Sequence, residues 1–376
     1  MAPGVNELVL EAYDFQGELV GTDSITVTST ATASPTDALR ISEINYHPAD
    51  PSVEELAALA SLDDNDFEFV ELHNTGDEVI DLTGIQLTDG IEYQFSSGNL
   101  AAGERAVLVR DLAAFRLRYG NQPRVLGLYA GSLSNGGERL EVVDGGGRLL
   151  LEVDYRDAGL WPVAADGVGG TLELHRDVAI EDNGKHYAWR SSTLPGGTPG
   201  EQNSQPIGIV INEVLAHTDP PLTPSDSIEL FNASDREIDL GGWYLSDSRD
   251  DLFKFEIPVG TRLAPGEFLV FDEGDFNPTP LTPADHHFAL SSANGDDVWL
   301  TVPDGTGGIQ AFVDDVNFGA TLNGESMGRV PNGQGHLAPM VDLTLGGTNS
   351  DARVDQVAVT EVNFRPAMPT LEALAV

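Results

Sequence analysis

The feature that most constrains this chain is an internal repeat. The stretch "ISEINYHPADP" at 41–51 returns as "VINEVLAHTDPP" at 210–221 and as "VTEVNFRPAMP" at 359–369. The segments that follow also match in order, so that "EFVELHNTGDEVIDLTGIQLTDG" at 68–90 corresponds to "DSIELFNASDREIDLGGWYLSDS" at 226–248. Self-similarity that keeps its order and spacing indicates one structural unit used more than once. We therefore expect repeated domains, each beginning with the recurring stretch as its first strand.

The matching segments predict an all-β unit. Each is a short run of alternating apolar and polar residues bounded by Gly, Asn, Asp or Pro, which is typical of strands joined by tight turns in a sandwich. In "FVEL" and "SIEL" the two-sided alternation is broken, which indicates either chain crossing between sheets or partial burial. A chain of 376 residues that is 40% hydrophobic suits two or three domains, each with its own core.

Two short helices are predicted inside the first unit. In "DLAAFRLRYG", Asp111 is placed to cap the helix, Leu112, Phe115 and Tyr119 share a face, and a Gly ends it. In "SVEELAALAS", a Ser and a Glu have capping-box spacing. The second unit lacks both segments and carries the Pro-rich "FNPTPLTPAD" in place of the first. We expect the two units to differ in surface at these positions.

The segments "SEINYHP", "EFVELHNTG", "IDLTGIQLTDG", "LAAGERAVLV" and "SLSNGGERLEVVDGGG" together resemble a bacterial lamin-tail domain. This resemblance implies an immunoglobulin-like β-sandwich, so the expected fold class is all-β with tandem immunoglobulin-like domains and a few short helices. Bacterial members are similar in being repeated modules of large secreted or surface proteins. The resemblance therefore implies an extracellular or cell-surface location and other domains in a longer chain.

The repeat also predicts the domain boundaries. The expected parts are the end of a preceding immunoglobulin-like module at 1–30, a linker at 31–38, the first lamin-tail-like domain at 39–203, a linker at 204–206, the second domain at 207–349, and a linker with the first strand of a third, truncated domain at 350–376.

Charge excludes several classes of partner. The formal net charge is -42, and the Lys and Arg residues form no clustered run. Nucleic acids and anionic lipid surfaces are bound through clustered basic side chains, so neither is an expected partner. No apolar run approaches the roughly 18 residues of a membrane span, so we expect no direct membrane insertion. The absence of Cys excludes disulfides and thiolate metal sites.

Four carboxylates are the first candidate site, because both units keep them within apolar strands. They are Glu43 and Glu71 in the first unit, and Glu213 and Glu229 in the second. One hypothesis is structural: each accepts hydrogen bonds from a neighbouring loop backbone, or from Asn74 and Asn232. The other is that the paired carboxylates bind an ion or act as acid and base.

Acidic loop runs are the second candidate site. The carboxylates concerned are Asp63, Asp64, Asp66, Glu68, Asp247, Asp250, Asp251, Asp272, Glu273 and Asp275. Carboxylate oxygens in loops suit calcium, although none of these runs has the spacing of an EF-hand. The alternative is a solvated acidic surface that follows from composition. Calcium is the one cofactor that the sequence suggests.

Other chemistry is disfavoured. Gly324, Ser326 and Gly328 spell the G-x-S-x-G of a nucleophile elbow, but the segment is predicted to be a strand and no helix follows it. The eight His residues show no zinc spacing, and adjacent His286 and His287 are expected on opposite faces of a strand. The four Trp residues lie in distant segments, which favours core packing over an exposed glycan platform.

These observations predict a non-catalytic structural or adhesive module pair from a secreted or cell-surface protein. Two alternatives stay open. The first is a carbohydrate-binding accessory module, whose partner would be an extracellular polysaccharide, and a surface protein is an equally acceptable partner for an adhesive module. The second is a hydrolase that uses the repeated carboxylates.

Overall fold

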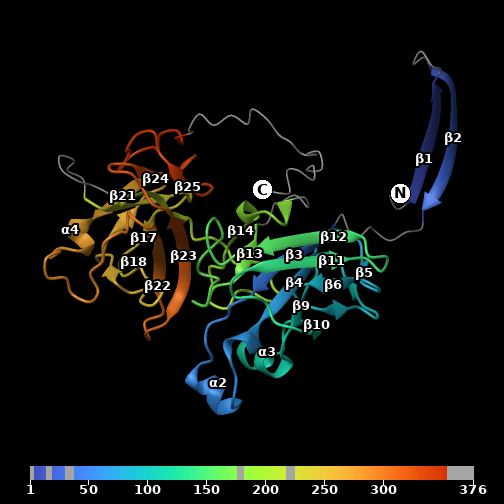
Figure 1. The fold of residues 1–376 in the computed structure, drawn as a ribbon, viewed down its shortest axis with the longest axis horizontal. Helices are drawn as coiled ribbons and strands as arrows, with labels where there is room; N and C mark the ends of the chain where they lie inside the picture. The colour runs from blue at the N-terminus through green and yellow to red at the C-terminus, as the bar shows by residue number, and fades with distance from the viewer. Residues whose placement is uncertain (1–3, 14–18, 30–37, 176–181, 217–224, 354–376) are drawn as a thin grey trace, which may run out of the picture.

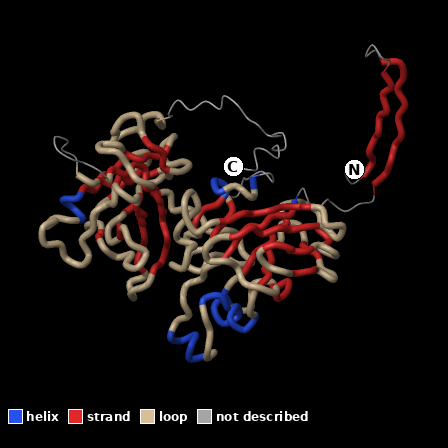
Figure 2. The backbone as a smooth tube through the Cα atoms, in the orientation of Figure 1, coloured by secondary structure: helices blue, strands red, loops and turns tan. Residues whose placement is uncertain are grey.

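The computed structural model describes residues 4–13, 19–29, 38–175, 182–216 and 225–353. Strands dominate both large bodies of the chain, and helices are few and short (Figure 2). The N-terminal strands β1 (Gly4–Tyr13) and β2 (Leu19–Ser29) pair antiparallel as a separate two-stranded sheet (Figure 1). The assignment of this hairpin to a preceding module stays a prediction.

Module one comprises residues 38–204 and consists of two packed sheets. Its strands are β3 (Leu39–Asn45), β4 (Phe69–Asn74), β5 (Ile80–Asp81), β6 (Gln86–Asp89), β7 (Tyr93–Gln94), β8 (Asn99–Leu100), β9 (Arg105–Val109), β10 (Val125–Leu128), β11 (Glu138–Val143), β12 (Leu149–Tyr155), β13 (Leu172–Leu174) and β14 (Trp189–Ser191). A six-stranded sheet in the order β10-β9-β4-β3-β13-β14 faces a four-stranded sheet in the order β12-β11-β6-β7, and β5 pairs with β8. The main core fills the space between the two sheets.

Module two comprises residues 207–353 and repeats this topology. Its strands are β15 (Ile209–Leu215), β16 (Ser227–Asn232), β17 (Ile238–Asp239), β18 (Tyr244–Ser246), β19 (Phe255–Glu256), β20 (Arg262–Leu263), β21 (Phe268–Asp272), β22 (Asp296–Pro303), β23 (Ile309–Phe318), β24 (Ser326–Arg329) and β25 (Leu337–Pro339). The order β21-β16-β15-β24-β25 repeats β9-β4-β3-β13-β14 of module one. The order β19-β18-β22-β23 repeats β7-β6-β11-β12. The predicted all-β tandem fold is confirmed.

The same turn chemistry recurs at the same place in both modules. Gly84 and Gly242 each precede the strand that leads into the smaller sheet, and each has φ of +84°. That conformation is open to Gly and strained for residues with a Cβ, because the Cβ of an L-residue approaches its own carbonyl there. The repeat therefore preserves backbone geometry as well as hydrophobic pattern.

The helices follow their predicted caps. They are α2 (Val53–Ala58), η1 (Asp64–Phe67), α3 (Leu112–Tyr119), η3 (His186–Ala188) and α4 (Glu273–Phe276). The capping box of α2 is present, and Asp111 accepts hydrogen bonds from two backbone N–H groups of α3. Phe115 and Tyr119 pack edge-on against Phe69. Leu112 is 41% exposed, so the predicted three-residue face of α3 is correct for two of its members.

The broken alternation in β4 has its cause in a second layer. Val70 and Leu72 point into the main core between the sheets. Phe69, on the opposite face, belongs to a smaller cluster with Phe115 of α3. Both faces of β4 are therefore buried, and of the two sequence interpretations it is burial rather than a crossing between sheets that explains the apolar run.

Most of the predicted N-terminal linker and the predicted third copy lie in parts of the chain that the structure does not describe. They fall in residues 30–37 and 354–376. Ser204, which was predicted to begin the linker between the modules, instead donates through its backbone N–H and its hydroxyl to the Glu173 carboxylate of module one.

Candidate functional site

A β-bulge places polar side chains on the outer face of the large sheet. The register between β3 and β4 shifts between Ile41 and Glu43, while Ile41 and Ile44 both remain in the main core. A bulge adds one residue on one strand, so that two consecutive side chains can share a face. Ser42 and Glu43 both make their contacts on that outer face, and the Ser42 hydroxyl donates to Oε1 of Glu71 over 2.6 Å.

Three buried carboxylates lie in one row across this face. Glu173 of β13 pairs with Glu43 of β3, and Glu43 pairs in turn with Glu71 of β4. All three residues are 0% exposed. We call Glu173, Glu43 and Glu71 the carboxylate row. Isolated charges of this kind are strongly disfavoured away from water, so their partners decide whether the module is stable.

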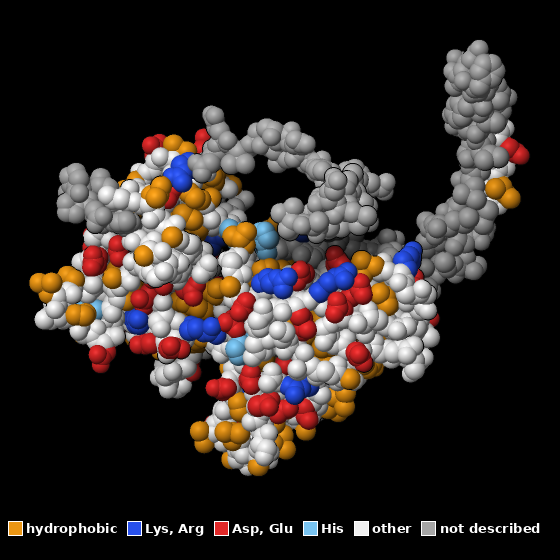
Figure 3. Space-filling view, viewed as in Figure 1, with side chains coloured by type: hydrophobic (Ala, Val, Ile, Leu, Met, Phe, Trp, Pro, Cys, Tyr) orange, Lys and Arg blue, Asp and Glu red, His pale blue; other side chains and the backbone are white. Residues whose placement is uncertain are grey.

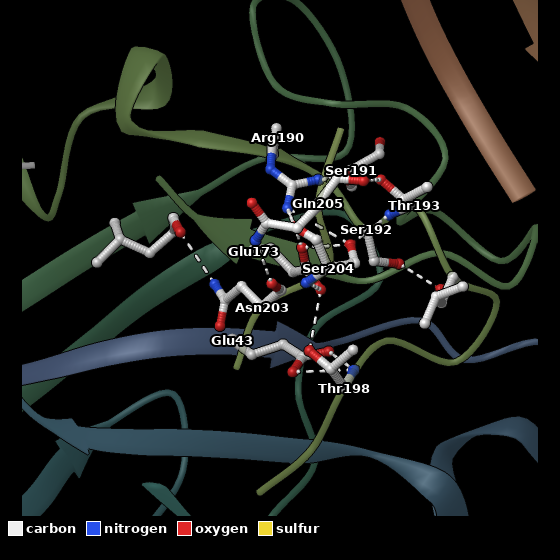
Figure 4. Close-up of polar contacts among 12 residues, drawn as sticks. Glu43, Glu173, Arg190, Ser191, Ser192, Thr193, Thr198, Asn203, Ser204 and Gln205 are labelled. Atoms are coloured by element: carbon white, nitrogen blue, oxygen red, sulfur yellow. Dashed lines mark hydrogen bonds and ion pairs between the residues drawn. The ribbon is translucent and has the colours of Figure 1, made fainter. Parts of the chain in front are cut away.

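The partners come from a returning segment that we call the module-one strap, residues 195–204. Its backbone N–H groups donate to all three members of the row, and Figure 4 shows the surroundings of Glu43 and Glu173. Thr198 N donates to Glu43 over 3.0 Å, Gly200 N to Glu71 over 2.7 Å, and Ser204 N to Glu173 over 3.0 Å. The strap therefore covers the row and satisfies it with main-chain donors.

Side chains supply the remaining donors. The Thr171 hydroxyl donates to Glu43 over 2.7 Å. Guanidinium groups lie at the two ends of the row, where Arg105 binds Glu71 at 2.8 Å and Arg190 binds Glu173 at 2.5 Å. Two cations therefore face three carboxylates.

The central carboxylate, Glu43, is the least compensated. Burial, followed by the charges of Glu71 and Glu173, raises the pKa of Glu43 well above its ordinary value. Burial also raises the pKa of Glu71, although Arg105 opposes this change. The row is therefore a strained electrostatic arrangement that the strap and the two Arg residues hold together.

Module two contains a shorter version of the same arrangement. A register shift between Ile211 and Glu213 repeats the bulge, and Glu213 pairs with Glu229. Gly328 occupies the position of the third carboxylate. Burial raises the pKa of Glu229 to about 7.

The strap of module two, residues 344–349, closes over this pair. Thr344 N donates to Glu213 over 3.0 Å, and Gly346 N donates to Glu229 over 2.5 Å. The Ser326 hydroxyl of the G-x-S-x-G match is buried on β24 and donates to Glu213 over 2.5 Å, which confirms that this segment is a strand and not a nucleophile elbow.

The geometry leaves no space for a reaction at either pair. A Cβ on Gly197 would lie 1.7 Å from Oε1 of Glu43, so the strap packs directly on the carboxylate. Glu43, Glu71, Glu213 and Glu229 are all 0% exposed. Solvent and substrate therefore reach these groups only if the strap leaves.

Asn74 and Asn232 do not serve the carboxylates. Asn74 donates instead to the carbonyl oxygens of Glu78, Leu100 and Ala101, and Asn232 makes the equivalent bonds in module two. The predicted hydrogen bonds from loop backbone to the repeated carboxylates are present in the structure. The alternative prediction, that Asn74 and Asn232 donate to these carboxylates, is wrong.

The two straps and Glu173 were not among the residues predicted from the repeat. "GGTPGEQNS" at 196–204 and "GGTNS" at 346–350 are a further repeat, and it was visible in the sequence. Asn203 and Asn349 hold equivalent places, since each donates to a carbonyl of the bulged strand. Glu173 has Gly328 as its counterpart, so comparison of the repeats could not find it.

The acidic loop residues are mostly engaged in local structure. Asp63 with Asp66 forms the capping box of η1, and Asp272 with Asp275 forms that of α4. Asp247 binds Lys254 at 2.6 Å. Of the remaining candidates, Asp251 accepts from Phe253 N, Asp64 lies 3.6 Å from His47, and Asp250 is exposed.

Glu68 is buried in module one and not in a solvated loop. Its Oε2 accepts hydrogen bonds from the Tyr129 hydroxyl and from Leu133 N. Burial raises its pKa to about 7. Asp226 makes the equivalent bond to Leu290 N in module two. In the part of the chain that the structure describes, no group of three or more His, Asp or Glu side chains is placed to hold a metal ion, and calcium binding stays a prediction.

The adjacent histidines do not lie on a strand. His286 and His287 lie in a turn and their rings meet edge to face at 4.7 Å, so the expectation of a strand with opposed faces was wrong.

Trp161, Trp189 and Trp299 are buried. The fourth, Trp243, packs against the core of module two. An exposed tryptophan platform for glycans is therefore not formed by these residues.

The two modules meet in an interface that contains an apolar cluster. The cluster contains Val163, Ala164, Leu252, Trp299 and Phe312. Phe312 N of β23 donates to Thr193 O over 2.9 Å, and Val163 N donates to Asp315 over 2.8 Å. Arg249 forms an ion pair with Asp166 at 2.6 Å. In Figure 1, β23 lies beside β13 and β14 of module one.

The fold and these sites define the chain as a tandem pair of immunoglobulin-like structural or binding modules. The chain belongs to the lamin tail domain family: the family model described as Lamin Tail Domain matches residues 32–157 and 202–319, together more than half of the chain. This is a family of non-catalytic modules. Neither the curated proteins nor the solved structures include a match.

The matched segments leave out the last strand of the large sheet in both modules and most of the straps. The first ends before β13 and the second ends before β24. The strand that completes the large sheet and the strap that covers it are therefore identified by the structure. Among the described residues, no helix is long and apolar enough to span a membrane.

Proposed function

We propose that this chain is a rigid, non-catalytic pair of modules that spaces or presents other parts of a larger secreted or cell-surface protein. The observation that carries the proposal is the state of the carboxylates: every one that the repeat conserves is buried, hydrogen-bonded and covered by a strap. Such groups contribute to the stability of a unique fold when they are fully satisfied. They are not placed to bind or transform a substrate.

The interface between the modules supports the spacing role. Flexible pairs of domains meet through small polar contacts, whereas this pair shares an apolar cluster together with one backbone–backbone hydrogen bond and a further bond from Val163 N to Asp315. Asp315 lies at its centre, where burial raises its pKa to about 6. The net charge of -42 keeps an extended extracellular protein soluble and separated from its neighbours.

The absence of Cys in the sequence makes a distance measurement direct. Spin labels on Arg148→Cys in module one and Val259→Cys in module two occupy exposed positions, 67% for the Arg148 side chain and 89% for Val259. Double electron–electron resonance should give one narrow distance distribution. Phe312→Asp should broaden it, because a charge in the shared apolar cluster opposes contact between the modules. Leu281→Asp, at a residue that is 96% exposed, is the control.

A broad distribution in the wild-type chain, equal to that of Phe312→Asp, would contradict the proposed rigid pair. A narrow distribution that Phe312→Asp leaves unchanged would show that the apolar cluster does not hold the modules together.

A further inference from the structure

A cavity lies between the modules, and none of the carboxylate row lines it. Its volume is about 720 Å³, within the usual range for ligand pockets, and pockets occur preferentially at domain interfaces. Module one contributes the segment that follows β3, the end of α3 and the start of the strap. Module two contributes the turn at 249–253 and the hairpin tip at 307–309. We call this cavity the inter-module cleft.

One wall of the cleft contains an unsatisfied amide. Asn45 is 2% exposed, and its Nδ2 donates to the Tyr119 hydroxyl over 2.9 Å. Its Oδ1 is buried and has no hydrogen-bond partner. A buried acceptor without a donor costs about 1–3 kcal/mol, so such a group in a native structure calls for a partner. Asn45 lines the cleft, so a ligand hydroxyl there would supply one after a small shift of the buried amide.

The charges around the cleft disfavour both anions and metal ions. Arg118 is bound by Glu55 at 2.8 Å, and Arg249 is bound by Asp166 at 2.6 Å, so neither guanidinium is free to recruit an anion. Exposed Asp50 and Asp250 also line the cleft and repel negative ligands. No metal-holding group of side chains occurs within the described ranges.

Aromatic and aliphatic side chains form a further part of the lining, beside Ser52, Asp251 and several glycines. The rings of Tyr119, Phe253 and Phe312 contribute to it, as do Val168 and Ile309. Carboxylate, amide and backbone groups pair with hydroxyls, while aromatic faces pack against C–H surfaces. A ligand that carries many hydroxyls, apolar ring faces and no net charge matches all of these features.

We propose that the inter-module cleft binds a neutral saccharide. This inference rests on the proposed function, because the cleft has one wall from each module and exists only while the modules are held together. Asn45 and the acidic rim receive the sugar hydroxyls, and Phe253 packs against a sugar ring. The two modules then act as a glycan-binding spacer, with the site at their junction.

Isothermal titration of the full chain with cellohexaose, chitohexaose, mannohexaose and xylohexaose tests this proposal. We expect saturable binding of at least one of the four. Phe253→Ala should weaken that binding at least tenfold. Phe268→Ala is the matched control, because Phe268 is an equally half-buried ring paired with Phe231 outside the cleft, and it should bind as the wild type does.

A second variant keeps the test independent of ring packing. Ala49→Trp places a large side chain at the cleft wall and should abolish binding while leaving the label distance between the modules unchanged. The proposal is overturned if no oligosaccharide of the panel binds, if both variants bind like the wild type, or if the chain binds polygalacturonate in preference to all four neutral sugars. A narrow label distance without glycan binding overturns the cleft proposal and leaves the rigid pair intact.

Discussion

At the scale of single residues, each module buries a small set of carboxylates and holds them with main-chain donors. Glu43 accepts a hydrogen bond from Thr198 N, and Glu229 accepts one from Gly346 N. Main-chain donors are well suited to this task, because they are fixed by the fold and carry no side-chain entropy cost. The strap packs so closely on the carboxylates that some of its positions, such as Gly197, have no room for a Cβ.

Gly197→Ala should therefore destabilise module one by about 3 kcal/mol. Its φ is +73°, and the new Cβ would overlap Oε1 of Glu43. Gly103→Ala is a matched control, since Gly103 has the same φ of +73° but no atom within 4 Å of its ideal Cβ. The control should cost about 1 kcal/mol, from backbone conformation alone. Urea unfolding measures both, and equal losses would show that contact with Glu43 is unimportant.

Glu229→Gln should change how stability depends on pH. Burial raises the pKa of Glu229 from 4.5 to about 7, so the folded state holds this proton more tightly than the unfolded state. The resulting stability is fully present below pH 4.5 and is lost as pH rises through about 7, a total on the order of 3 kcal/mol. The Gln variant lacks this term.

Urea unfolding of wild type and Glu229→Gln between pH 4 and 8 measures that difference. Between pH 4 and 8, the free energy of unfolding of the wild type should fall relative to that of Glu229→Gln as the pH rises. Glu237→Gln, at an exposed ion pair with Arg262, should run parallel to the wild type. If Glu229→Gln also runs parallel, the carboxylate is ionised in both states and the burial argument fails.

At the scale of elements, the strap completes each sandwich. A bulge turns two consecutive residues of the first strand outward, β13 or β24 extends the sheet, and the strap closes the outer face. Asn203 fixes the end of the first strap to the carbonyls of Ser42 and Leu174. Asn349 fixes the second strap to the carbonyls of Asn212 and Arg329.

The two Asn residues allow a reciprocal test. Asn203→Ala should destabilise module one by about 2–3 kcal/mol, because two carbonyls lose their donor, and should leave module two unaffected. Asn349→Ala should do the reverse. Hydrogen exchange followed by mass spectrometry resolves the two effects through the protection of β3 and β15. Loss of protection in both modules from either variant would mean that they unfold as one cooperative unit.

Prediction from sequence succeeded where the determinants were local or repeated. The strands, the caps of α2 and α3 and the first strand of each module follow from alternation, capping residues and the repeat itself. The partners of Glu43 could not be predicted in the same way, because Thr171 and Thr198 are more than 120 residues away along the chain. Such pairings depend on which strand the chain adds next to β3.

At the scale of the whole molecule, negative charge is distributed over both modules (Figure 3). The acidic loops were predicted either to bind calcium or to form a solvated surface. Four of their carboxylates cap η1 and α4, and Asp247 binds Lys254, and these uses need no ion. The high net charge then acts through general repulsion, which salt screens.

Thermal unfolding should therefore give the same midpoint in millimolar calcium and in chelator at matched ionic strength. An ion that binds only the folded state raises the midpoint, whereas general screening depends on ionic strength alone. Raising sodium chloride from about 20 mM to 500 mM should raise the midpoint in both conditions, because it reduces repulsion among the acidic groups. A calcium-specific rise of several degrees would instead support calcium binding by the acidic loops.

The sequence by itself determined the all-β class, the tandem units and the first strand of each, because a repeated pattern of alternation and turn residues allows few other folds. Only the tertiary structure decided the fate of the carboxylates, the role of the straps and the contact between the modules. Burial and hydrogen bonding at Glu43, Glu71 and Glu173 depend on segments distant in the chain, and no local pattern specifies them. Strand alternation is a property of neighbours in sequence, whereas a buried charge is a property of everything that the fold places around it.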